Sequence, residues 1–267
     1  MEGSDQIYFR GGNYTLERSN YLPDASKDRR KISFADALGK SINPAFARVG
    51  LSQLSRAVLE RYALNFGFNS RIPFEAPLEM SKFELPDDDY LVARTAAGFG
   101  EVTLSPLHAA VLTGAIGNHG LMMKPYLIEQ VTDAKGAVRF QAQPTPLRTS
   151  ILRSTSQELL NMMQSTVEVG TARKQFLRSK SATLRSLSIA AKTGTLNGTD
   201  PKGTYHWFVA AVPAENPEIA VCALVISTGY SRVGGSALAR ELLEYYFQTR
   251  GRAIETRSER QVSEKKS

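Results

Sequence analysis

The last third of the chain contains three short apolar segments in succession, and their order constrains the fold more than any other feature of the sequence. The segments are Ser188–Thr195, Trp207–Val212 and Ile219–Ser227, and the turns predicted between them hold Asn197-Gly198 and Pro201, then Pro213 with Asn216-Pro217. Short apolar segments bounded by turns predict β-strands, and successive strands of this kind predict an antiparallel sheet. A helix predicted over Ser236–Phe247, with leucines along one side, would cover one face of that sheet.

The preceding two thirds of the chain carry helix signals. Ser33 and Thr155 stand in N-cap positions, and Thr155 has Glu158 three residues later, which forms a capping box. Ser105, followed by proline, predicts another helix start, and a fourth helical pattern follows Ser52. Helices followed by a sheet and a covering helix predict an α+β fold, an antiparallel sheet flanked by helices, rather than a parallel α/β fold.

Two other segments have a recognisable pattern. Tyr126–Thr132 and Ala137–Gln143 alternate in polarity around a turn, which predicts a β-hairpin. Residues 1–30 are polar and rich in turn residues. We expect a loop there, with a short strand at Gln6–Arg10 and no contribution to the core.

The chain is expected to form one domain over residues 1–248, followed by a charged tail over residues 249–267. The tail has mixed charges and only two β-branched aliphatic residues, Ile254 and Val262. Too little apolar surface is available there to offset the entropy of ordering, so we expect the tail to be disordered.

Composition limits the classes of function. The 267 residues have a formal net charge of +7 and a single cysteine, Cys222, which excludes an internal disulfide and a cysteine-based metal site. The three histidines lack metal-ligand spacing, so we expect neither a metal nor a cofactor. The basic charge fits an anionic partner or solubility alone. No aromatic or helix-turn-helix signature accompanies it, so we expect no nucleic acid partner.

The stretch Lys192-Thr193-Gly194-Thr195 carries the strongest chemical signal. On a strand edge, the lysine supplies a positive charge and the threonine hydroxyls can bind a carboxylate. The glycine leaves room for a substrate backbone to approach. Alone, the same four residues also fit the end of a strand with an exposed lysine.

Ser41-Ile42-Asn43 is a second candidate, between two predicted helices. A serine and an asparagine two residues apart on a loop can point into one cleft. The serine can then relay a proton and the asparagine amide can orient a substrate amide. Alone, this pattern also serves as a helix cap.

Together, an S-x-N followed about 150 residues later by K-T-G-T resembles the penicillin-binding proteins and serine β-lactamases. The resemblance spans roughly Gln6 to Phe247 and indicates an N-terminally truncated penicillin-binding transpeptidase domain. Further segments that match the family are Gly98-Phe99-Gly100, Thr103-Leu104-Ser105-Pro106-Leu107-His108, Gly170-Thr171-Ala172, Trp207-Phe208-Val209 and Ala211-Val212-Pro213.

The resemblance implies a role for each residue of the two motifs. Ser41 and Asn43 would line the cleft and relay a proton, which makes them catalytic residues together with Lys192. Lys192 would also hold the substrate carboxylate with Thr193. The substrate-binding residues would be Thr193, Gly194 and Thr195, with Gly194 keeping the strand edge open and Thr195 lying along a paired substrate.

In this family a serine attacks the D-Ala-D-Ala end of a peptidoglycan stem peptide, and the acyl-enzyme is resolved by a neighbouring stem. The ligands implied are therefore stem peptides and β-lactam antibiotics, and the partners implied are other cell-envelope synthesis proteins. The location implied is the periplasmic face of the cell envelope, with a membrane anchor. The sequence itself has no apolar stretch of ~20 residues and no signal peptide at its start.

The family's nucleophile motif, S-x-x-K, has no counterpart ahead of Ser41. Only Ser263 has a lysine three residues on, Lys266, and this pair lies in the charged tail. We expect the motif to fall upstream of Met1 and the chain as given to lack acyl-transfer activity.

Two other functions compete with a transpeptidase. A serine β-lactamase-like hydrolase needs a deacylation base, which is a glutamate in class A enzymes, and Glu158 is the nearest candidate. The second alternative is a catalytically dead sensor or remnant domain, which the missing nucleophile favours.

Overall fold

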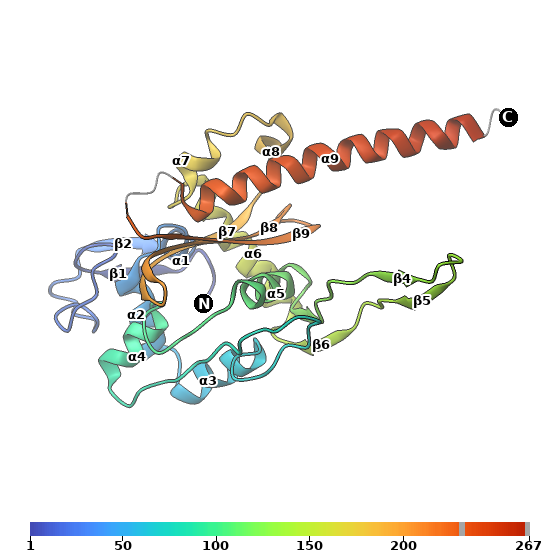
Figure 1. Ribbon diagram of the computed structural model, residues 1–267. Helices are drawn as coiled ribbons and strands as arrows, with labels where there is room; N and C mark the ends of the chain where they lie inside the picture. The colour runs from blue at the N-terminus through green and yellow to red at the C-terminus, as the bar shows by residue number, and fades with distance from the viewer. Residues whose placement is uncertain (230–232, 265–267) are drawn as a thin grey trace.

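A three-stranded antiparallel sheet with helices on both faces organises the chain, so the predicted α+β class is confirmed. The computed structural model describes residues 1–229 and 233–264, and side chains as far as residue 249. Figure 1 shows the sheet between two helical layers. The strands are β7 (Ala190–Thr199), β8 (Lys202–Val212) and β9 (Ile219–Ser227); the upper layer is α7 (Arg173–Phe176), α8 (Ala182–Ser186) and α9 (Gly235–Glu264); the lower layer is α5 (Pro106–Gly117) and α6 (Arg153–Glu168).

Both faces of the sheet are buried because β8 alternates between two apolar clusters. Phe208 and Val212 are fully buried in a cluster with Phe176 and Leu243, on the side of α7 and α9. Ala211 points the other way, into a cluster formed with α5 and α6. Successive side chains of a strand point to opposite faces, so one strand joins the two helical layers.

The three predicted strands are confirmed, but the predicted turn at Asn197-Gly198 is wrong. Asn197 and Gly198 pair with Thr204 and Gly203, and β7 and β8 reverse direction at Asp200-Pro201. Proline cannot donate a ladder hydrogen bond and suits a turn. A side chain at Gly198 would lie 2.1 Å from the ring of Tyr205, so this glycine serves close packing.

Most predicted helix starts are confirmed. Ser33 caps α1 (Phe34–Gly39) and Ser105 caps α5, each through its side-chain oxygen. The pattern after Ser52 forms α3 (Arg56–Asn65), which Ser55 caps. The remaining helices are α2 (Asn43–Ser52) and α4 (Asp89–Ala96).

The capping box predicted at Thr155 and Glu158 is wrong. Helix α6 begins earlier, at Arg153, and has no side-chain cap. Glu158 instead accepts a hydrogen bond of 2.6 Å from the backbone N–H of Gly3. A contact far along the sequence therefore replaces the local one.

Three two-stranded antiparallel sheets accompany the central one in the described part of the chain. The predicted hairpin is confirmed as β4 (Gln130–Thr132) and β5 (Val138–Gln141), which project from the body of the molecule (Figure 1). Strands β3 (Leu121–Met123) and β6 (Pro146–Thr149) pair at its base, and β1 (Gln6–Phe9) pairs with β2 (Arg30–Ser33).

The opening segment contributes to the core, so the expectation that it would not is wrong. Ile7 and Phe9 on β1 are buried against Ile42 and Ala45 of the loop and helix that follow α1. Alternation along four residues was enough to bury one face of this strand.

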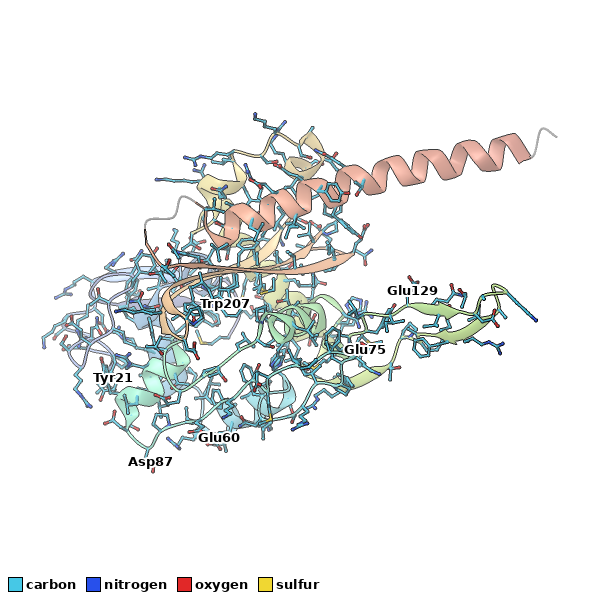
Figure 2. The ribbon with its side chains drawn as sticks, viewed as in Figure 1. Tyr21, Glu60, Glu75, Asp87, Glu129 and Trp207 are labelled. Atoms are coloured by element: carbon cyan, nitrogen blue, oxygen red, sulfur yellow. The ribbon has the colours of Figure 1, made fainter. Side chains whose placement is uncertain are left out.

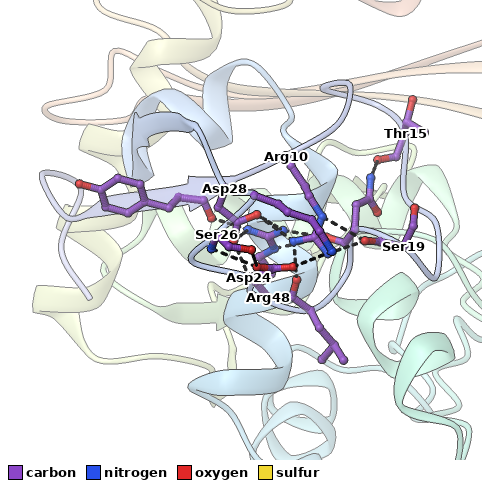
Figure 3. A network of polar contacts seen from close by, with 11 residues as sticks. Arg10, Thr15, Ser19, Asp24, Ser26, Asp28 and Arg48 are labelled. Atoms are coloured by element: carbon purple, nitrogen blue, oxygen red, sulfur yellow. Dashed lines mark hydrogen bonds and ion pairs between the residues drawn. The ribbon is translucent and has the colours of Figure 1, made fainter.

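A buried ion-pair network fastens the same segment to α2 (Figure 3). Both terminal nitrogens of Arg48 contact the Asp28 carboxylate, at 2.8 and 2.9 Å, and Arg10 contacts it at 2.9 Å. Arg48 also donates to the backbone oxygens of Tyr8 and Asn20. Burial acts to raise the pKa of Asp28, but hydrogen bonds from the Asp24 N–H and the two arginines outweigh it and lower that pKa.

Helix α9 continues past its predicted end near Phe247 and runs to Glu264. The division into a domain of residues 1–248 and a disordered tail stays a prediction, and residues 265–267 lie outside the described residues. In the described part of the chain, no helix is both long and apolar enough to span a membrane.

Gly39 provides a test of how tightly α1 packs against α6. A side chain at Gly39 would lie 2.5 Å from the backbone of Ser165, so Gly39→Ala must push the two helices apart. We expect a loss of about 1–3 kcal/mol in the free energy of unfolding, measured by urea denaturation. The control is Gly114→Ala in α5, where the nearest atom would lie 3.8 Å away. That variant should gain up to about 1 kcal/mol from helix propensity; equal effects would contradict the close packing.

Candidate active site

A cleft of about 910 Å³ lies where β7 meets the loop between α1 and α2. Its lining includes every catalytic and substrate-binding residue that the resemblance implies. These are Ser41, Asn43, Lys192, Thr193, Gly194 and Thr195.

Ser41 occupies a strained position on the loop between α1 and α2. Its φ of 54° is left-handed, which is uncommon for a residue with a side chain. Its N–H donates to Leu38 O at 3.1 Å, and the buried Ile42 next to it donates to Ala37 O at 2.9 Å. This tight exit from α1 turns the Ser41 hydroxyl toward β7.

Lys192 on β7 meets that hydroxyl. Its Nζ donates to Ser41 Oγ at 3.0 Å and to its neighbour's backbone oxygen, Thr193 O, at 2.7 Å. The structure therefore brings together two motifs that are distant in the sequence.

Lys192 has an unusual electrostatic environment. Among the described residues, no carboxylate forms an ion pair with it, and both contacts of its ammonium group are to neutral oxygens. Loss of hydration lowers the pKa of Lys192 to about 8. A partly buried cation without a counterion favours the binding of an anion beside it.

Asn43 is buried, and part of its hydrogen-bonding capacity is already used. Its backbone N–H donates to Asn13 O at 2.8 Å and its side-chain Nδ2 donates to Tyr14 O at 3.0 Å. Asn43 thus anchors the opening loop to the start of α2. The expected role, orienting a substrate amide, is left to its oxygen and its second amide hydrogen.

The K-T-G-T stretch lies on an edge strand, since the sheet order is β7-β8-β9. Gly194 pairs with Trp207 and the exposed Thr195 pairs with His206. Trp207 lies between the sheet and the helices α2 and α4 in Figure 2. An open edge carries backbone donors and acceptors that an extended peptide can pair with.

The cleft also contains residues that the sequence analysis did not assign to a site. Thr171, in the turn between α6 and α7, has its Oγ1 2.6 Å from Thr193 Oγ1. Tyr14, Phe99 and Trp207 form part of the wall. Thr171, Phe99 and Trp207 lie in segments that match the family, which is the signal that could have found them. Tyr14 lies in a polar loop and has no such signal.

No acidic side chain lines the cleft in the described part of the chain. Glu158, the candidate deacylation base, is on α6 and bonded to Gly3, outside the cleft lining. The structure therefore offers no support for it as a base.

Comparison with known proteins agrees with this geometry. The family model of the penicillin-binding protein transpeptidase domain matches residues 4–244. The chain belongs to this transpeptidase family. It is 31% identical over 215 residues to the peptidoglycan D,D-transpeptidase PbpA of Mycolicibacterium smegmatis, which covers 78% of the chain and 42% of that relative.

Solved transpeptidase structures share the fold. The D,D-transpeptidase domain of a peptidoglycan glycosyltransferase from Eggerthella lenta superposes with a TM-score of 0.76 at 25% identity, covering 94% of this chain and 61% of that one. An imipenem acyl-enzyme complex of penicillin-binding protein A from Mycobacterium tuberculosis has a TM-score of 0.72 at 26% identity, covering 92% and 54%. The chain thus spans about half the length of the relatives that it matches.

Two substitutions at Ser41 should separate the contribution of its hydroxyl to the free energy of unfolding from the cost of its left-handed backbone. Ser41→Ala removes an acceptor of the Lys192 ammonium and should cost about 1–3 kcal/mol in the free energy of unfolding. Ser41→Gly removes the same hydroxyl but relaxes the left-handed backbone, so it should be more stable than Ser41→Ala by about 0.5–1 kcal/mol. Urea denaturation measures both.

The matched control is His119, which is exposed and also left-handed, with a φ of 56°. His119→Gly and His119→Ala should differ by a similar amount, because only the backbone effect applies there. If the Ser41→Ala variant were as stable as the Ser41→Gly variant, the backbone strain at this position would be contradicted.

Proposed function

We propose that this chain forms the carboxylate-binding side of a D,D-transpeptidase cleft, which takes the D-Ala-D-Ala ends of peptidoglycan stem peptides and the β-lactams that imitate them. The observation that carries the proposal is the ammonium group of Lys192 on the edge strand β7, which lies 3.0 Å from Ser41 Oγ and has no counterion among the described residues. Two findings support it: PbpA relatives are named peptidoglycan D,D-transpeptidases, and penicillin-binding protein A forms acyl-enzymes with imipenem and penicillin G.

Substrate binding follows from the chemistry of these residues. Lys192 and the Thr193 hydroxyl would hold the terminal carboxylate through charge-assisted hydrogen bonds. Gly194 would let the peptide backbone lie against β7, and the N–H of Thr195 would face the carbonyl oxygen that becomes negative in the transition state. The peptide would add to the sheet as an extended strand.

The reaction itself needs a serine oxygen that attacks the penultimate D-Ala carbonyl. The C–N bond to the terminal D-Ala breaks, and a proton must reach the departing amine. Ser41 Oγ and Lys192 Nζ, in contact at 3.0 Å, would relay that proton. The amine of a neighbouring stem then attacks the ester and makes the cross-link.

The attacking serine is not assigned to any residue of this chain. The only S-x-x-K match is Ser263 with Lys266, and this lysine lies outside the described residues. We infer that the 267 residues bind these ligands without being acylated by them. The site of action would be the cell envelope, where peptidoglycan is built.

A second candidate function for these 267 residues, which have no S-x-x-K match ahead of Ser41, is a β-lactam- or peptide-sensing module that binds without catalysis. A β-lactamase-like hydrolase has no such support, because no carboxylate lines the described cleft. The two candidates share a ligand and differ in whether a serine supplied from outside these 267 residues forms an acyl-enzyme at the cleft.

Trp207 allows binding to be measured directly, because it is the single tryptophan and lies in the cleft. An N-acylated D-Ala-D-Ala peptide should change its fluorescence saturably, and the C-terminal carboxamide of the same peptide should bind much more weakly. Lys192→Ala should weaken binding of the carboxylate form by roughly 10- to 100-fold, the value of a charge-assisted hydrogen bond. Lys180→Ala, which removes an exposed positive charge, is the matched control and should leave the affinity near that of the unmutated chain.

Intact-mass analysis after incubation with penicillin G completes the test. We expect no covalent adduct. An adduct on any serine would show that a nucleophile is present, and equal binding of the carboxylate and carboxamide peptides would refute the proposed cleft.

Binding should also depend on pH through Lys192. Its pKa in the free protein is about 8, so the ammonium form that attracts a carboxylate predominates below that pH. The ligand carboxylate stays ionised throughout this range. The association constant should therefore be flat below about pH 7 and fall by roughly tenfold per unit above pH 8, as the neutral amine takes over. The Trp207 titration from pH 6 to about pH 10 measures this, and a profile for Lys192→Ala with the same fall would assign the effect elsewhere.

A further inference from the structure

The turn between α6 and α7 reaches the cleft at Thr171 and is held there rigidly. The N–H of Thr171 donates to Gly39 O at 3.0 Å, and the N–H of Ala172 donates to Thr166 O at 3.0 Å. A side chain at Gly170 would lie 2.1 Å from Gly39 O, so only glycine allows this approach. Thr171 is thereby fixed against the end of α1, two residues before Ser41.

The Thr171 hydroxyl has two neighbours at different distances. Thr193 Oγ1 lies at 2.6 Å and Gly39 O at 3.3 Å. A normal hydroxyl hydrogen bond is about 2.7–2.8 Å long, so the contact to Thr193 is the strong one. No other side-chain hydrogen bond of Thr193 is present among the described residues.

The two hydroxyls can be arranged in two ways, because either oxygen can be the donor of the 2.6 Å bond and Gly39 O can accept only from Thr171. Each hydroxyl has one proton and two lone pairs. When Thr171 gives its proton to Thr193 Oγ1, the proton of Thr193 is left to point into the cleft, beside Lys192. We infer that Thr171 is a positioning residue, which directs the Thr193 hydroxyl proton toward the ligand carboxylate. This inference rests on the proposed function of the cleft.

An anion in the cleft strengthens this arrangement. Its negative charge favours the chain in which Thr171 donates to Thr193 and Thr193 donates to the anion. Hydrogen bonds arranged in sequence polarise one another. A ligand without the charge gains little from it, so the contribution of Thr171 is specific to the carboxylate.

The test is a double-mutant cycle on the intact chain, read by Trp207 fluorescence with the N-acylated D-Ala-D-Ala peptide and its carboxamide. Thr171→Val keeps the side-chain shape and the backbone bond to Gly39 but removes the hydroxyl. It should weaken binding of the carboxylate peptide by roughly three- to tenfold and leave the carboxamide unchanged. Thr171→Ser restores the hydroxyl and should restore binding to within about twofold.

The cycle also includes Thr193→Val and the double variant. If Thr171 acts through Thr193, the double variant should bind no more weakly than Thr193→Val alone. A double variant whose loss of affinity equals the product of the two single losses would overturn the inference. An equal loss for both peptides with Thr171→Val would also overturn it, because it would mean a merely structural role.

Failure of the inference can be told from failure of the proposed function. If the unmutated chain prefers the carboxylate peptide and Lys192→Ala removes that preference, but Thr171→Val keeps it, only the role of Thr171 is refuted. If the unmutated chain shows no preference, both are refuted.

Discussion

The contact between the backbones of Gly39 and Gly170 is the one on which the cleft depends. Gly39 ends α1 and Gly170 follows α6, and a side chain on either residue would overlap the other segment. The close approach leaves Gly39 O free to accept from Thr171 and sends the chain directly into the left-handed turn at Ser41. Helix α6 packs on both α1 and β7, so this close approach sets the position of the Ser41 loop relative to the strand with Lys192.

The other side of the cleft depends on charge rather than on close packing. The Asp28 carboxylate binds Arg10 and Arg48 in a buried network, so the opening loop is joined to α2 (Figure 3). Asn43, at the start of α2, then holds the backbone of Tyr14 in the cleft wall. Breaking such a network from one side leaves a buried charge uncompensated, which is costly. A polar segment of the chain is thus a rigid part of the site.

The sequence predicted the parts of the fold that local chemistry determines. The three strands, the caps at Ser33 and Ser105 and the hairpin all follow from short-range patterns. The errors have a common physical cause, which is a contact outside the local pattern: Gly198 packs on a residue of the paired strand β8, and Glu158 binds a residue 155 positions away. Gly198 was interpreted as a turn but packs on a tyrosine ring, and Glu158 was interpreted as a cap but binds Gly3.

The candidate site shows the same division. K-T-G-T and S-x-N were found because their residues are adjacent in sequence. Tyr14 and the hydrogen bond between Thr171 and Thr193 were missed, because only the folded chain brings them to the cleft.

The open edge of β7 has a consequence for how this protein behaves in concentrated solution. An edge that can accept an extended peptide can equally accept a strand from another molecule, and such edges promote self-association. Natural sheets discourage this with an inward-pointing charge or by covering the edge with another segment. Lys192 supplies the charge, and the α6–α7 turn with Thr171 lies against the same stretch. The residues that would select a ligand would therefore also disfavour aggregation. A variant that neutralises Lys192 would make pairing of β7 with a strand of a second molecule easier.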